Sequence, residues 1–169
     1  MTYKPLRYIS AYPQDLQEQV GALLDENKLG DILKQRHPQV HSLSSGAALY
    51  EYAQAIKNQY LRSSPPISKV VYDDKLHVVD HALGMHTFVS RVQGNKLKAK
   101  KEVRISTLFR QTPESFLRMI IVHELAHLRE KAHNKAFYKL CEYMEPSYHQ
   151  LELDVRLYLC HRERHGDLW

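Results

Sequence analysis

Three residues in the second half of the chain have the types and the spacing that bind a metal ion and use it. His123, Glu124 and His127 form the pattern H-E-x-x-H. On a helix, residues four apart lie about 40° apart around the axis and one turn apart along it, so both imidazoles can point at one ion. Glu124 projects about 100° from His123, which places a carboxylate beside the ion, where it can take the proton of a bound water. The pattern predicts a Zn²⁺ site with Glu124 as the catalytic base, and the alternative is a structural pair of histidines.

A third histidine follows at a spacing that suits a zinc site. Catalytic zinc commonly takes three protein ligands and leaves the fourth position to water, so His133 is the expected third ligand. An unbroken helix would carry His133 about 15 Å along the axis from His123. The helix is therefore expected to end between Arg129 and Ala132, so that the chain can turn back. Carboxylates further along the chain are the rival third ligands: Glu142, Glu145 and Glu152.

The helix that carries the motif is expected to be buried over most of its surface. From Phe116 to Leu128 the apolar residues are interrupted only by the motif residues and Arg118. Thr112 is the expected N-cap and Pro113 the first helical residue. Polar side chains on a buried helix need partners, and a zinc ion with its water would supply them.

Hydrophobic periodicity elsewhere in the chain predicts helices that come before and after the strands of a small sheet. Helices are expected at 16–24, 31–36, 45–62, 134–144 and 147–163, and Gly30 is expected to end the first of them. Runs rich in Val and Ile predict strands at 67–72, 76–80, 87–92 and 103–106, with a turn at Gly94 and Asn95. We expect an α+β fold with a small, mostly antiparallel sheet. The expected domain organisation is a single domain, in which 1–66 forms a helical region packed on 67–169.

Length and composition indicate an ordinary globular protein. The chain has 169 residues, 43% hydrophobic and 25% charged, which suits one domain with a proper core. No apolar run approaches the roughly eighteen residues of a membrane span, and the first residues lack the apolar core of a secretory signal. We therefore expect a cytoplasmic protein that does not bind membranes. Cys141 and Cys160 form no C-x-x-C pair, which argues against a disulfide framework and against thiolate ligands.

The densest basic run in the chain is NKLKAKKEVR at 95–104, and the net charge is +5. Because lysines protect the edges of sheets, the favoured interpretation is a solvated edge strand. The alternative is a surface at 96–104 that binds a nucleotide or a nucleic acid, although the run has no aromatic residue on which bases could stack. A fourth metal ligand could come from a segment before this run, and the candidates are His77, His81 and His86.

The residues around the motif also match a family pattern. The chain reads HELAHLREKAHNKAF at 123–137, preceded by KLKAKKEVRIS and followed by YKLCEYMEPSYHQLE. In these segments it resembles the YgjP-like metallopeptidase family, which is related to the WLM and SprT-like zincins. The resemblance runs from about 67 to 162 and implies a zincin-like fold, zinc held by His123, His127 and His133, and Glu124 as base. Metzincins have the same histidine spacing, but they carry a glycine where this chain has Glu130. One member of the YgjP-like family is described as a pyrophosphatase acting on UTP.

Three functions are consistent with this site. The principal prediction is a zinc-dependent metallopeptidase, with a peptide or protein substrate extended along the edge of strand 103–106. The second is a hydrolase of nucleoside triphosphates such as UTP, with the lysines of 96–101 holding the phosphates. The third is a non-enzymatic zinc module that associates with nucleic acid and has a closed, four-ligand site. The candidates for stabilising a developing oxyanion are Tyr143, Tyr148, His149 and Arg156.

Overall fold

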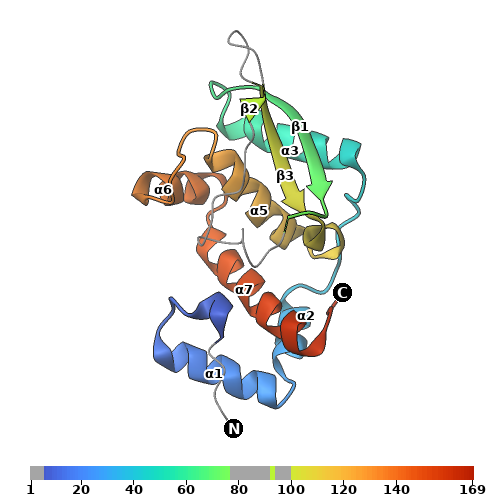
Figure 1. The fold of residues 1–169 in the computed structure, drawn as a ribbon, viewed down its shortest axis with the longest axis vertical. Helices are drawn as coiled ribbons and strands as arrows, with labels where there is room; N and C mark the ends of the chain where they lie inside the picture. The colour runs from blue at the N-terminus through green and yellow to red at the C-terminus, as the bar shows by residue number, and fades with distance from the viewer. Residues whose placement is uncertain (1–5, 77–91, 94–99) are drawn as a thin grey trace.

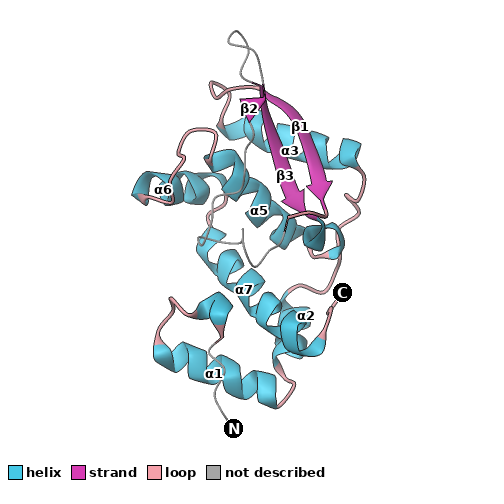
Figure 2. Ribbon diagram, in the orientation of Figure 1, coloured by secondary structure: helices cyan, strands magenta, loops and turns pink. Residues whose placement is uncertain are grey.

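The computed structural model describes residues 6–76, 92–93 and 100–169, and it has the predicted α+β architecture (Figures 1 and 2). The N-terminal elements are η1 (Arg7–Ile9), α1 (Gln14–Asp25), α2 (Leu29–Arg36) and α3 (Gly46–Tyr60). The strands are β1 (Ile67–Asp73), β2 (Val92–Gln93) and β3 (Lys100–Ser106). The C-terminal elements are η2 (Thr107–Gln111), α5 (Glu114–Ala126), α6 (Lys135–Met144) and α7 (Tyr148–His165). Among the described residues, no helix combines the length and the apolar character needed to cross a bilayer.

The sheet has the strand order β1-β3-β2, and its longer pairing is parallel. Val70 lies opposite Val103 in the parallel pair, whereas β2 pairs with β3 in the antiparallel sense through Val92 and Lys101. The prediction of a mostly antiparallel sheet is therefore wrong for the described strands. Antiparallel neighbours can be joined by a short hairpin, but β1 and β3 are separated by 74–99, a stretch long enough for the crossover that parallel strands need. The strand predicted at 76–80, most of that at 87–92 and the turn at 94–95 lie outside the described residues.

Strand β3 is the central strand of the described sheet, so the expectation that its basic residues mark an edge strand is wrong. Val103 and Ile105 are buried on one face, and Glu102 and Arg104 alternate with them on the other. On that second face Arg104 donates to Asp73 of β1 at 2.7 Å and pairs with Glu102 at 3.1 Å. Glu102 and Arg104 of β3 therefore form cross-strand and same-face ion pairs within the sheet.

Helix α5 lies between the sheet and α7 and forms the centre of the molecule (Figure 1). Its apolar side chains from Phe116 to Leu125 are fully buried, as predicted. Its start is one residue later than predicted, because Pro113 is the N-cap and α5 begins at Glu114. Thr112 does not cap the helix, since its hydroxyl donates to the carbonyl of Phe109 at 3.3 Å.

The N-terminal helices pack on the same core as the motif helix. One continuous hydrophobic cluster runs from Ile9 to Cys160 and takes in residues of both 1–66 and 67–169, which supports the proposal of a single domain. Gly30 does not end a helix as expected, because it lies in the first turn of α2. A Cβ at this position would lie 2.7 Å from Cε1 of His161, so the glycine allows α2 to approach α7 closely.

Candidate metal centre

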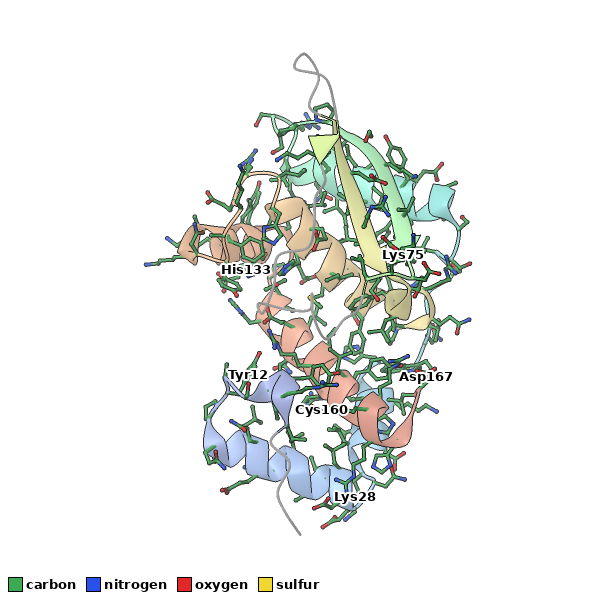
Figure 3. All side chains as sticks on the ribbon, in the orientation of Figure 1. Tyr12, Lys28, Lys75, His133, Cys160 and Asp167 are labelled. Carbon is green, nitrogen blue, oxygen red and sulfur yellow. The ribbon has the colours of Figure 1, made fainter. Side chains whose placement is uncertain are left out.

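The structure brings the three predicted histidine ligands together. His123 lies in the last turn of α5, His127 caps its C-terminus, and His133 lies in the loop before α6 (Figure 3). The Nε2 atom of His127 is 3.3 Å from that of His123 and 3.1 Å from that of His133. The Nε2 atoms of His133 and His123 are 3.2 Å apart. Three ligand atoms therefore surround one point.

The chain turns back earlier than the sequence predicts. Helix α5 ends at Ala126, three residues before the expected break, and the amides of Arg129 and Glu130 both donate to the Ala126 carbonyl, at 3.1 and 3.0 Å. No residue from 127 to 134 has a positive φ, since among the described residues only Asn27 and Gly166 do. The turn therefore has no need of the glycine found in metzincins, and Glu130 fits it without strain.

Hydrogen bonding fixes which nitrogen of His127 faces the cluster. Its Nδ1 lies 2.8 Å from the carbonyl oxygen of Glu130. A carbonyl oxygen can only accept, so Nδ1 must carry the proton and Nε2 of the neutral ring presents a lone pair. That lone pair points at the Nε2 atoms of His123 and His133. A cation at the centre is the arrangement that makes such a convergence favourable.

Phe137 forms one wall of the cluster. Asn134 starts α6 by accepting from the Phe137 amide at 2.8 Å, as the sequence predicts for a helix beginning here. The Phe137 ring centroid lies 4.9 Å from the ring of His123, 4.6 Å from that of His127 and 4.9 Å from that of His133. One buried aromatic ring therefore holds all three imidazoles in place.

Glu124 is buried beside this cluster without being part of it. The residue is only 4% exposed, and its Oε1 atom has no hydrogen-bond partner among the described residues. Burial raises the pKa of this carboxyl well above its usual range. The group of ligand atoms contains the three histidines and not Glu124. A buried polar atom without a partner is costly, so its retention fits a carboxylate that acts on a bound water.

Burial keeps the three imidazoles neutral near pH 7. It lowers the pKa of His123 well below 6.5, with further contributions from the charges of His127 and His133. Burial is also the main reason why the pKa values of His127 and His133 are lowered. The Lys101 charge contributes to the shift at His127, and its ammonium donates to the Leu128 carbonyl at 3.2 Å. Neutral imidazoles are the form that binds metal ions.

The rival third ligands are engaged elsewhere. Glu142 pairs with His149 at 2.9 Å, Glu145 with Arg118 at 3.0 Å, and Glu152 with Arg156 at 3.1 Å. His77, His81 and His86 lie outside the described residues. Cys141 and Cys160 are buried free thiols whose pKa values burial raises to about 12, which disfavours the thiolate form.

The candidates for an oxyanion donor have other contacts in the structure. The Tyr148 hydroxyl lies 2.9 Å from Nδ1 of His123, on the side of the ring that faces away from the cluster. Arg156 donates to the carbonyl of Tyr8 at 2.8 Å as well as to Glu152. Sequence reasoning missed the contact of Tyr148 with His123, because no sequence pattern links two residues on different helices.

The donor set fits a zinc ion. Tetrahedral zinc with Zn–N bonds of about 2.0–2.1 Å places its ligand nitrogens about 3.3–3.4 Å apart. The measured separations of 3.3, 3.1 and 3.2 Å agree with this value to within about 0.3 Å. Three neutral nitrogen ligands with an adjacent carboxylate also match the donor chemistry of hydrolytic zinc sites.

Comparisons with known proteins identify relatives of the chain. A family model described as "YgjP-like, metallopeptidase domain" matches residues 76–156. The UTP pyrophosphatase of Escherichia coli (strain K12) is 60% identical to this chain over 154 residues, which cover 91% of the chain and 92% of the relative. No solved structure matches the chain significantly.

Proposed function

This chain belongs to the YgjP-like family, and we propose that it is a zinc-dependent hydrolase of nucleoside triphosphates, with UTP as the substrate. The family and the relative both indicate a hydrolase. The observation that carries the choice of substrate is the 60% identity, over nearly the full length of both chains, to a UTP pyrophosphatase. The sequence motif by itself favoured a peptide bond, and this relative favours a phosphoanhydride.

The residues of the cluster would divide the chemistry between them. A zinc ion on the Nε2 atoms of His123, His127 and His133 would supply a Lewis acid and lower the pKa of a bound water towards about 7. A nearby cation favours the ionised form of Glu124, and burial makes that carboxylate a stronger base. Glu124 accepts the proton as the water oxygen bonds to the α-phosphorus. The bond from this phosphorus to the bridging oxygen breaks, and pyrophosphate leaves with the electron pair.

The position of Lys101 favours a phosphorylated substrate. It is the last lysine of the basic run, and its ammonium lies at the carbonyl of Leu128, the residue that follows His127. The Lys101 side chain is partly exposed, so it can contact a ligand at the rim of the cluster. A triphosphate carries several negative charges that need such cations both for binding and in the transition state. The other lysines predicted to hold phosphates lie in segments whose side chains are outside the described residues.

Peptide hydrolysis is the second candidate. Two observations favour it. Three histidines with a buried glutamate are also the arrangement found in metallopeptidases, and the family model is described as a metallopeptidase domain. Residues 103–106 of β3 pair on one side with β1, so a peptide would have to add along the opposite side, beyond the two-residue pairing of β3 with β2. A zinc module that associates with nucleic acid is the third candidate; within the described residues the cluster has three ligands and not four.

A substrate panel tests the proposal. Zinc-loaded protein is incubated with the common nucleoside triphosphates and, separately, with a peptide library, and pyrophosphate release and peptide cleavage are measured. We expect pyrophosphate from UTP, loss of this activity on chelation, and its return with zinc. Glu124→Gln is expected to keep the metal and to lower turnover by about 10²–10⁴-fold, while Glu142→Gln, a change in a surface ion pair, leaves turnover unchanged. Peptide cleavage without nucleotide hydrolysis would establish the second candidate, and full activity of zinc-loaded Glu124→Gln would overturn the role of the base.

A further inference from the structure

Helix α7 presents three polar residues to the metal cluster and to the N-terminal segment. Tyr148, Glu152 and Arg156 are four residues apart and therefore lie along one face of the helix. The Tyr148 hydroxyl is 2.9 Å from Nδ1 of His123. Arg156 donates to one oxygen of Glu152 through Nη2 at 3.1 Å and Nε at 3.3 Å, and through Nη1 to the carbonyl of Tyr8 at 2.8 Å.

The direction of these hydrogen bonds follows from their chemistry. The Nε2 atom of His123 faces the Nε2 atoms of His127 and His133 at 3.3 and 3.2 Å, so in the neutral ring that binds a metal the proton lies on Nδ1. The hydroxyl oxygen of Tyr148 lies 2.9 Å from this nitrogen and accepts from Nδ1–H of His123.

We propose that Tyr148 is a positioning residue that holds His123 in the tautomer that binds metal, with Nδ1 protonated and Nε2 free to coordinate. The proposal rests on the zinc site proposed above. The Glu130 carbonyl does the same for His127, so two of the three ligands have an oxygen partner behind the ring. Partners of this kind raise the basicity of a ligand and typically change metal affinity by about 10–100-fold.

Arg156 connects α7 to the N-terminal segment. Besides its bond to Tyr8, its guanidinium lies 6.0 Å from the ring centroid of Tyr12, which Figure 3 places beside α7. The side chains of Arg156 and Glu152 are only 12% and 11% exposed, so their ion pair is largely shielded from solvent. Arg156 thereby fixes the Glu152 carboxylate, which lies one helical turn from Tyr148.

Replacing Tyr148 by phenylalanine isolates the hydroxyl from the ring. Tyr148 is fully buried, and its ring also packs in the aromatic cluster of α6 and α7, so a purely structural role would survive in Tyr148→Phe. Tyr138→Phe is the matched control, because Tyr138 belongs to the same ring cluster and no contact of its hydroxyl with the three histidines is found among the described residues.

The test measures the affinity for zinc alone, by competition with a chromogenic chelator. We expect Tyr148→Phe to bind zinc about 10–100-fold more weakly than the wild type, and Tyr138→Phe to bind it equally well. Long-range ¹H–¹⁵N spectra of the imidazoles in the zinc-loaded wild type should show His123 protonated at Nδ1, with a slowly exchanging proton that Tyr148→Phe loses.

The outcomes separate this proposal from the zinc site itself. If the wild type binds no zinc, the proposed site fails, and the role of Tyr148 fails with it. If the wild type binds zinc and Tyr148→Phe matches it, only the role of Tyr148 is overturned. If Tyr148→Phe does not fold, the wild-type spectrum decides: His123 protonated at Nδ1 with a protected proton supports the proposal, and a freely exchanging proton overturns it.

Discussion

The buried carboxyl of Glu124 is expected to lower the free energy of unfolding of the metal-free protein. Its Oε1 atom is buried without a hydrogen-bond partner among the described residues, in a residue 4% exposed. An unsatisfied buried polar atom costs about 1–3 kcal/mol. Glu124→Met keeps the length of the side chain and removes the polar oxygens. The free energy of unfolding of the chelator-treated protein should therefore rise by about 1–3 kcal/mol, while hydrolysis is lost.

For a chain of this size, that change corresponds to a rise of about 2–12 °C in the unfolding midpoint. Urea denaturation followed by circular dichroism, with chelator present throughout, measures the free energy directly. Glu142→Met is the control, since Glu142 lies in an exposed pair and its replacement should change stability by no more than about 0.5 kcal/mol. A Glu124→Met protein less stable than the wild type would show that the carboxyl has a stabilising partner, and the argument from its burial would be wrong.

Two further changes probe the rim of the site and the scaffold. Lys101→Met should raise the KM for UTP about tenfold, with a smaller effect on kcat. A cation that binds the substrate and the transition state equally well acts on KM, and a tenfold change corresponds to about 1.4 kcal/mol of binding free energy. Lys34→Met on α2, far from the sheet in Figure 1, is the control, and equal effects of the two changes would contradict a local role. Gly30→Ala should lower the free energy of unfolding by about 1 kcal/mol, because overpacking costs about 1–3 kcal/mol against a gain of about 1 kcal/mol in helix propensity. Gly46→Ala, with nothing within 4 Å of the added Cβ, should not destabilise; if it costs as much as Gly30→Ala in urea denaturation, close packing at position 30 is not the cause.

The spacing of residues along the chain was enough to predict the cluster of three histidines and most helices. The H-E-x-x-H spacing predicted a buried helix with two histidines on one side, and α5 has this form. Ser45 and Asn134 were expected where helices begin, and each accepts from a backbone amide three residues on, at 3.1 and 2.8 Å. These features are local, because a cap or a pair of residues four apart depends only on neighbours along the chain. His133 was predictable for the same reason, since a short turn sufficed to bring it back.

The tertiary structure alone decided the features that depend on which elements pack together. The parallel pairing of β1 and β3 and the central place of β3 depend on which strands meet, which strand periodicity does not encode. Gly30 has its role because α2 meets α7, and a glycine that permits close packing looks in the sequence like one that ends a helix. Tyr148 reaches His123 from another helix, 25 positions along the chain, so no local pattern predicted this contact. A metal cluster can be read from spacing on one helix and its turn, whereas the partners that orient it come from distant segments that only folding brings into contact.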